Sequence, residues 1–203
     1  MTPTREQIIE LADYLIRKKG FHGFSYTDIS GVMDVRNAAI HYHFPSKSDL
    51  GEAVITAEIA KIGSVRRACR GLPGDEQLRK LITTFYHHRE QGQLCLNGAL
   101  TPDYYTFTPS MQEGVKRMCA DTLDWASECL EKGRLEDRLH FEGAAADRAL
   151  LLLSTLLSSL LLSRVLGGNV FEKALNQLLL DMRVAWSVAD LPPVEWPAAG
   201  RNR

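Results

Sequence analysis

Four side chains able to make hydrogen bonds lie close together near the N-terminus, between positions 36 and 47. Arg36 and Asn37 carry the paired groups that recognise guanine and adenine, respectively, on their major-groove edges. Tyr42 carries a donor that can reach a phosphate, and Lys47 adds a positive charge. The two alanines that follow Asn37 permit close approach and offer methyl groups to thymine. This pattern is typical of a surface that reads double-stranded DNA.

The elements that must position these groups are two short helices and a turn. Ser25-x-x-Asp28 is a capping box, which predicts a helix over 26 to about 32. Ser46-x-x-Asp49 is a second capping box, which predicts the start of a later helix. Residues 33–35 form the turn, where glycine is usual. Asp34 stands there, and aspartate tolerates a positive φ better than most residues. We expect the first helix to bury Ile29 and Val32.

The second short helix is expected from Arg36 to about His43. It must end before Pro45, because the residue before a proline avoids the helical region. Its buried residues should be Val35 and Ile40. A second helix joined to the first by a tight turn is the geometry that enters the DNA major groove.

Residues 5–55 resemble the N-terminal region of TetR/AcrR-type transcriptional repressors. The resemblance is carried by Gly20-Phe21, Asp28-Ile29 and the run from His43 to Leu50, HFPSKSDL. It implies that Thr27, Tyr42 and Lys47 hold the DNA backbone. The tyrosine expected at position 41 is a histidine here, so phosphate contacts are expected to be shared between His41 and Tyr42. The full set of expected DNA-binding residues is Thr27, Arg36, Asn37, Ala38, Ala39, His41, Tyr42 and Lys47.

The C-terminal part is rich in leucine. A helix over about 142–166 has leucines on every side, so it needs partners on every side. With a following helix, expected to reach about Val188, two copies would form a four-helix interface about a two-fold axis. The resemblance implies the same homodimer. The expected interface residues are Leu153, Leu157, Leu161, Leu178, Met182 and Trp186.

Aromatic and sulfur-containing residues collect between positions 85 and 125, as is typical of small-molecule pockets. Related repressors bind an inducer in this region, which implies an inducer site here. The expected ligand-binding residues are Tyr86, Cys95, Tyr104, Met118 and Trp125. Some relatives carry a reactive cysteine in this region, so a thiol-based or electrophile-sensing repressor that uses Cys95 is an alternative.

The composition excludes several other classes of protein. The net charge is −1, and residues 1–50 hold six basic and six acidic side chains, so DNA binding must depend on where charges lie. The four cysteines form no C-x-x-C pair, so neither a metal nor another cofactor is expected. Neither a signal peptide nor a membrane-spanning run is recognisable, which predicts a cytoplasmic protein without membrane partners. No catalytic spacing is visible, so an enzyme is not expected.

The sequence therefore predicts an all-α protein of about nine helices. We expect a three-helix helix-turn-helix DNA-binding domain at 1–50, a helical ligand-binding and dimerisation domain at 51–190, and a flexible tail at 191–203. The predicted function is a homodimeric repressor that binds an inverted-repeat operator and is released by a small-molecule inducer. The remaining alternative is a small-molecule-binding or protein-interaction module without DNA binding.

Overall fold

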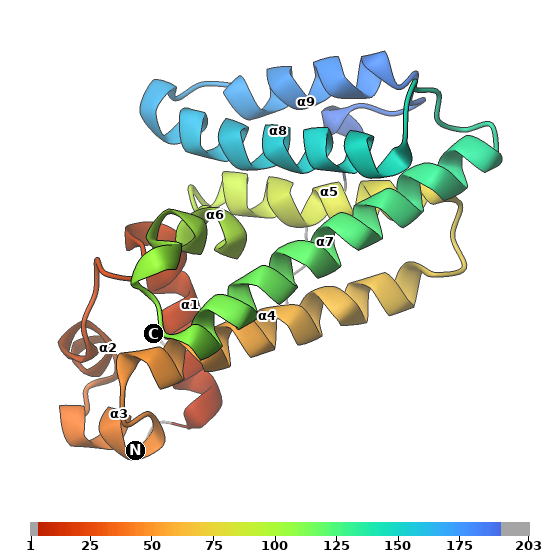
Figure 1. Ribbon diagram of the computed structural model, residues 1–203. Helices are drawn as coiled ribbons and strands as arrows, with labels where there is room; N and C mark the ends of the chain where they lie inside the picture. The colour runs from red at the N-terminus through yellow and green to blue at the C-terminus, as the bar shows by residue number, and fades with distance from the viewer. Residues whose placement is uncertain (1–3, 192–203) are drawn as a thin grey trace. The chain divides into compact units, whose positions relative to one another are not determined.

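The computed structural model describes residues 4–191, and within that range it contains nine α-helices, two short 3-10 helices and no strand (Figure 1). The all-helical prediction is confirmed. The helices are α1 (Arg5–Lys19), α2 (Tyr26–Met33), α3 (Asn37–His43), α4 (Lys47–Cys69), α5 (Gly74–Glu90), α6 (Leu96–Leu100), η1 (Thr101–Thr106), α7 (Pro109–Leu135), α8 (Ala145–Leu166), α9 (Val170–Asp181) and η2 (Val188–Asp190).

The described residues divide into two compact units. Unit 1 comprises residues 4–59 and Leu96–Met118, and unit 2 comprises Ala60–Cys95 and residues 119–191. Unit 1 thus contains α1, α2, α3, α6 and η1, with the N-terminal parts of α4 and α7. Unit 2 contains α5, α8 and α9, with the C-terminal parts of the same two long helices.

The core of unit 1 forms around α1. Thr4 and Gln7 cap this helix reciprocally, with the Thr4 hydroxyl accepting from the Gln7 N–H at 3.2 Å and the Gln7 side chain accepting from the Thr4 N–H at 2.9 Å. Phe21, just after α1, meets Phe107 edge-on at 5.1 Å between ring centroids. The fully buried aliphatic residues of this core include Ile8, Ala12, Ile16, Ile29, Ile40, Leu50 and Val54.

A buried cation also joins α1 to α4 within unit 1. The Arg17 guanidinium is 1% exposed and lies 2.8 Å from an Asp13 carboxylate oxygen and 2.9 Å from a Glu58 carboxylate oxygen. Burial alone would lower the pKa of Arg17, but the charges of Glu58 and Asp13 outweigh it and raise the pKa above its usual value. Arg17 is therefore a paired internal charge that fixes α1 against α4.

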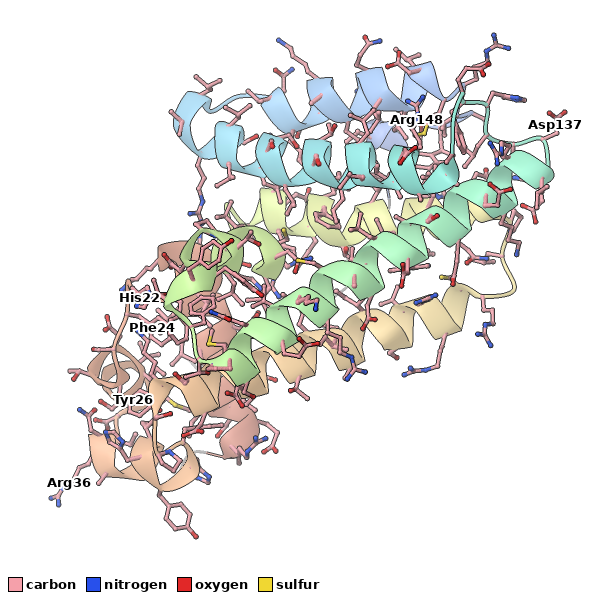
Figure 2. All side chains as sticks on the ribbon, viewed as in Figure 1. His22, Phe24, Tyr26, Arg36, Asp137 and Arg148 are labelled. Atoms are coloured by element: carbon pink, nitrogen blue, oxygen red, sulfur yellow. The ribbon has the colours of Figure 1, made fainter. Side chains whose placement is uncertain are left out.

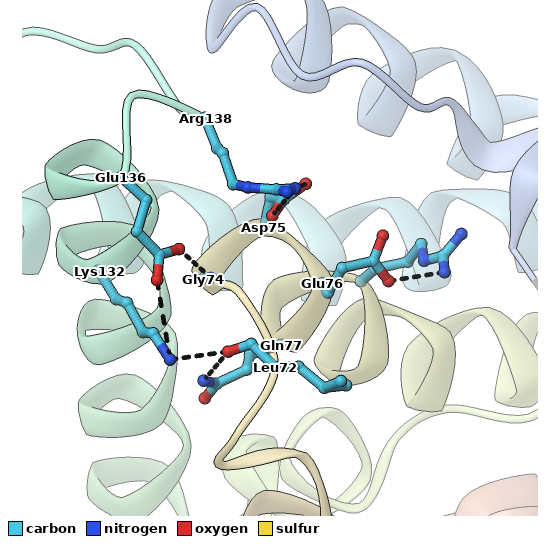
Figure 3. A network of polar contacts seen from close by, with 9 residues as sticks. Leu72, Gly74, Asp75, Glu76, Gln77, Lys132, Glu136 and Arg138 are labelled. Carbon is cyan, nitrogen blue, oxygen red and sulfur yellow. Dashed lines mark hydrogen bonds and ion pairs between the residues drawn. The ribbon is translucent and has the colours of Figure 1, made fainter.

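Unit 2 has a dense polar network where the turn between α4 and α5 meets the end of α7 (Figure 3). The Lys132 ammonium donates to the Leu72 carbonyl at 2.7 Å, and the Gly74 N–H donates to a Glu136 carboxylate oxygen at 2.7 Å. Arg138 donates to both oxygens of the buried Asp75 carboxylate, at 3.0 and 3.1 Å. We call this set, together with Gln77, the α5–α7 clamp.

The helices α8 and α9 pack against each other in unit 2. Among the described residues, α8 alone is long and apolar enough to cross a membrane, with 33% of its most apolar stretch buried. Core helices of soluble proteins meet the same test, so this feature is weak evidence for a membrane span.

Three expectations about the elements are wrong. Val32 is 70% exposed, because the short α2 turns only the side of Tyr26, Ile29 and Ser30 toward the core. The last long helix ends at Asp181 and not near Val188, since Arg183 adopts a left-handed φ of 51°. The helix α8 begins at Ala145 and not at 142. The tail expected at 191–203 lies outside the described residues, except for Leu191.

Candidate nucleic-acid interface

The first short helix, α2, begins at the predicted capping box. The Asp28 carboxylate accepts from both the backbone N–H and the hydroxyl of Ser25, at 2.8 Å each, and lies 3.2 Å from the Lys19 ammonium. These bonds favour the ionised carboxylate, the Ser25 backbone bond most strongly, and lower the pKa of Asp28 to about 2. The predicted box at Ser46 and Asp49 also forms, with the same 2.8 Å bonds.

The turn between α2 and α3 contains the expected backbone conformation. Asp34 has φ 54° and ψ 49°, which is left-handed, and its N–H donates to the Ser30 carbonyl. The next N–H, of Val35, donates to the same carbonyl at 3.0 Å. The expectation that aspartate accepts the position usual for glycine is therefore confirmed.

The second short helix, α3, presents an open outer face. The helix begins at Asn37, one position later than expected, so Arg36 is the residue just before it. The Arg36 side chain points away from the protein (Figure 2). Tyr42 is 84% exposed. Ala38 and His41 are exposed and Ala39 is half-buried, while Ile40 is the buried residue of the helix. Small side chains and exposed donors thus share the accessible face.

Asn37 and Thr27 lie together and are both exposed, and the Asn37 side chain is bonded to α2. The Asn37 side-chain oxygen accepts from the Ser30 hydroxyl at 2.5 Å, and its amide nitrogen donates to the Thr27 hydroxyl at 3.2 Å. Both partners are on α2, so the Asn37 side chain bridges the two helices. The sequence pattern, which gave Asn37 a role toward DNA, carried no sign of this bridge.

The opposite end of α3 is also fastened to α2. The Tyr26 hydroxyl donates to the Phe44 carbonyl at 2.9 Å, and this bond is buried. The His41 ring meets the Tyr26 ring edge-on at 4.6 Å between centroids. Burial, with a smaller effect of the Asp49 charge, raises the pKa of Tyr26 to about 12.

Lys47 occupies an internal position at the start of α4. Its ammonium donates to the Phe24 carbonyl and lies over two aromatic rings, 4.2 Å from the Phe24 centroid and 4.9 Å from the Phe21 centroid. Burial lowers its pKa, against the opposing effect of the Asp28 charge. Lys47 therefore links the loop after α1 to α4.

The residues expected at a ligand site fall in both units. Tyr104 and Met118 belong to unit 1, whereas Tyr86, Cys95 and Trp125 belong to unit 2. Met118 and Trp125 are each 1% exposed, and Cys95 is also buried. The half-buried Tyr86 ring lies 6.2 Å from the Phe171 ring. The indole N–H of Trp125 is buried without a hydrogen-bond partner among the described residues.

Unit 2 also contains a cavity that the sequence did not predict. It has a volume of about 210 Å³ and lies between the end of α5 and the end of α8, with Arg89, Gln93, Ser163 and Arg164 among its lining residues. The Arg89 guanidinium is held 2.7 Å from Glu172. Its walls include Gly92, Gly167 and Gly168, which all have positive φ.

The residues expected at a dimer interface are mostly buried within one chain. Leu153, Leu178, Met182 and Trp186 are buried, Leu157 is half-buried, and Leu161 is 42% exposed. The expectation chose leucines by helical spacing, which cannot distinguish the inner side of a hairpin from the outer side. The exposed large apolar residues of α8 and α9, which we call the outer apolar face, are Leu150, Leu151, Leu161, Leu162, Val165, Leu166 and Leu180.

Comparison with known proteins agrees with this geometry. Residues 8–54, which contain α2, the turn and α3, match the family model of bacterial regulatory proteins of the tetR family. Residues 8–54 are therefore a DNA-binding domain of the tetR type. The chain is thus a DNA-binding, helix-turn-helix transcription regulator, and the resemblance based on Gly20-Phe21 and the HFPSKSDL run is confirmed.

Solved structures of TetR-family proteins share the whole fold. A TetR-family transcriptional regulator from Agrobacterium tumefaciens is 28% identical with a TM-score of 0.80, the match covering 88% of this chain and 96% of that one. A TetR regulator from Legionella pneumophila is 28% identical with a TM-score of 0.77, covering 90% and 98%.

A more distant structure shares the fold with a ligand bound. It is a transcriptional regulator from Saccharomonospora viridis, titled as a complex with choline. It is 18% identical with a TM-score of 0.68, the match covering 87% of this chain and 95% of that one. No curated protein matches the chain in sequence.

Proposed function

We propose that this regulator is a homodimeric repressor that binds an inverted-repeat operator and leaves it when a small molecule binds. The observation that carries the proposal is the open outer face of α3, where Arg36 and the 84% exposed Tyr42 flank small side chains. Such a face fits a major groove closely, because nothing bulky keeps the helix from the base edges. The family and the fold point to a regulator and not to an enzyme.

In this proposal the exposed residues on and beside α3 make the DNA contacts. Arg36 bonds a guanine, Ala38 and Ala39 contact base edges through methyl groups, and Tyr42 with His41 reaches phosphates. Thr27 is exposed at the start of α2, and in this proposal it contacts the DNA backbone. Unit 1 has no excess of positive charge in its first 50 residues. A single copy should therefore bind weakly, and two linked copies are needed.

The outer apolar face of unit 2 supports the dimer. Monomeric proteins rarely expose a contiguous apolar patch of this kind. Leu161 and Val165 lie one helical turn apart on α8, and Val165 is 83% exposed. A second copy of the same face would cover both, and a two-fold axis makes one patch serve both chains.

In this proposal the protein is cytoplasmic. The inducer is a small molecule that binds in the part of the chain after the DNA-binding domain. Trp125 is the best single member of such a site, since its buried indole N–H lacks a partner that a ligand could supply. Cys95 supports the alternative of a thiol or electrophile sensor. The residue is only 6% exposed, so a reagent would reach its sulfur only after the surrounding segment opens.

The experiment begins with DNA selection. The full-length protein is used to enrich duplexes from a library with a randomised central region, and the winners are tested by gel shift across salt concentrations. The proposal expects an enriched inverted repeat and affinity that falls steeply with salt. Arg36→Ala should relax one base position in each half-site, while Arg134→Ala, far along α7, serves as the control. Failure to enrich any sequence would contradict the proposal.

The dimer has a separate test by sedimentation. Leu161→Glu and Val165→Glu place charges on the outer apolar face and should shift the protein from dimer to monomer. Leu135→Glu is the matched control, because Leu135 is 78% exposed at the end of α7 and outside that face. An unchanged dimer in both outer-face variants would argue against this interface.

A further inference from the structure

The recognition helix cannot hold its own orientation. It has seven residues, no side-chain cap at its N-terminus and one buried side chain, Ile40. Isolated helices of this length are unstable in water, because the cost of the first turn is not recovered. Its direction must therefore come from contacts with other elements, and the nearest is α2.

One tether holds the N-terminal end of α3. The Asn37 oxygen accepts from the Ser30 hydroxyl at 2.5 Å, and the Asn37 nitrogen donates to the Thr27 hydroxyl at 3.2 Å. Recognition of adenine by asparagine uses the same oxygen and the same nitrogen. Turning the amide toward a base would break both bonds to α2. Ser30 itself is 6% exposed, so it is placed to hold Asn37 and not to touch DNA.

A second tether holds the C-terminal end. The Tyr26 hydroxyl donates to the Phe44 carbonyl, the first residue after α3, at 2.9 Å. The Tyr26 side chain is 8% exposed and packs against His41 of α3. Ser30 is four positions after Tyr26 and three after Thr27, and both spacings place side chains next to each other on the helix, so Tyr26 and Thr27 flank Ser30 on α2. Both ends of α3 are thus fastened to α2.

We infer that Asn37 is a positioning residue, which sets the angle of α3 on α2 together with Ser30 and Tyr26, and is not the reader of an adenine. The inference rests on the proposed DNA-reading role of α3. It removes Asn37 from the residues expected to contact bases, and leaves Arg36 with the face formed by Ala38, Ala39 and Tyr42. It also explains how a helix with so little burial can present those groups at a fixed angle.

The test compares a buried and an exposed member of the same tether. Ser30→Ala cannot remove a base contact, because Ser30 is buried, whereas Asn37→Ala removes both the tether and any base contact. Each variant and the double variant is tested on the duplex site that the wild-type protein enriches from the randomised library. Base preference at every position of the half-site is then measured. Asn169→Ala, an exposed asparagine with no side-chain capping bond in unit 2, is the matched control.

The expected result is the same profile for both single variants. Each should lose about tenfold in affinity, as for one lost, partly buried hydrogen bond. Discrimination should weaken at all positions read by α3 together, and the double variant should be no worse than the worse single one. If Asn37→Ala relaxed a single base position and Ser30→Ala left the profile unchanged, Asn37 would be a base reader and the inference would be wrong.

Amide hydrogen exchange in the free protein provides a readout that needs no DNA. Ser30→Ala and Asn37→Ala should each speed exchange at residues 39–44 by about tenfold relative to α1. Tyr26→Phe keeps the ring and deletes only the hydroxyl, so it should speed exchange mainly at the Phe44 end. If the wild-type protein enriched no DNA, the proposed function would fail, but unchanged exchange in these three variants would independently overturn the tethers.

Discussion

Two turns between consecutive helices, one in each unit, are held in opposite ways. In unit 1 the turn between α2 and α3 carries the exposed Asp34, and neutral hydrogen bonds from Asn37 and Tyr26 tie the helices together. In unit 2 the turn between α4 and α5 is held by charged side chains of the α5–α7 clamp, including Arg138, one guanidinium nitrogen of which donates to both oxygens of Asp75 (Figure 3). Bonds to charged groups are roughly twice as strong as neutral ones.

The difference shows which part of each unit is held by its strongest polar interactions. A helix that must lie in a DNA groove needs a free outer face, so its contacts are confined to one side. The turn of unit 2 has no such restriction, and its polar groups are bonded from several directions. Unit 1 places its strong interactions away from α3, in the buried pair of Arg17 and Glu58. The helix α3 is thus held by a few neutral hydrogen bonds, while α1 and α4 are joined by a buried ion pair.

The largest expected effect comes from removing the buried ion pair between Arg17 and Glu58. Arg17→Ala removes the cation and leaves Glu58, which is 8% exposed, without its buried partner. Removing one partner of a buried ion pair costs about 3–5 kcal/mol, so the free energy of unfolding should fall by that amount. Urea unfolding followed by circular dichroism measures it. Arg134→Ala, which breaks the half-exposed pair with Glu131, should cost below about 1 kcal/mol. Equal effects of the two variants would show that the burial of Arg17 carries no special weight.

The next effect tests the closest approach in unit 2. A Cβ added at Gly74 would lie 2.2 Å from the Gly133 backbone nitrogen and 2.6 Å from the Cys129 carbonyl oxygen. These are backbone atoms and cannot rotate away, so Gly74→Ala should lower the unfolding free energy by about 3 kcal/mol. Gly71→Ala, three residues earlier, meets nothing within 4 Å and should change stability by less than about 0.5 kcal/mol. Thermal melting of the two variants decides whether the contact between α5 and α7 is as tight as described.

A smaller effect is expected at the turn of unit 1. Asp34 has φ 54°, a conformation that a β-branched side chain resists. Asp34→Val should lower the unfolding free energy by about 1–2 kcal/mol, while Asp34→Gly should be close to neutral. Thermal melting of both variants measures this, and gel shift shows whether DNA affinity follows stability. A valine variant as stable as the glycine variant would mean that the turn relaxes freely.

The features that the sequence predicted well are local. The capping boxes at Ser25 and Ser46 depend on residues three positions apart, and the left-handed Asp34 depends on the turn itself. The all-helical fold followed from periodicity.

The features that the sequence missed depend on which segments meet in space. Lys47 donates to the carbonyl of Phe24, 23 residues away, which no spacing rule indicates. Val32 was expected inside because it is apolar, yet it lies on the open side of a short helix and is 70% exposed. The bond between Ser30 and Asn37 depends on how closely α2 approaches α3, which the position of Asn37 on α3 does not indicate.

The smallest expected effect uses one motif that occurs in both units. Asp28 accepts two bonds from Ser25 in unit 1, and Asp190 accepts two bonds from Ser187 in unit 2. Both carboxylates have a lowered pKa, caused first by the serine backbone N–H, and Asp28 has the Lys19 ammonium 3.2 Å away in addition. Because the pKa of each carboxyl is lower in the folded state than in the unfolded state, each cap stabilises its unit at pH values above the unfolded-state pKa. Its contribution is lost as the pH falls.

For Asp28 the loss should extend from 3.8, the ordinary value, down through about 2. NMR titration of the Ser25 and Ser187 amides should show that the Ser25 amide keeps its bonded chemical shift to lower pH. Lys19→Ala should narrow that difference without moving the Ser187 amide. If both amides titrated together in the unaltered protein, Lys19 would contribute nothing to the cap. The cap of α2 would then persist to no lower pH than the cap of the short helix η2.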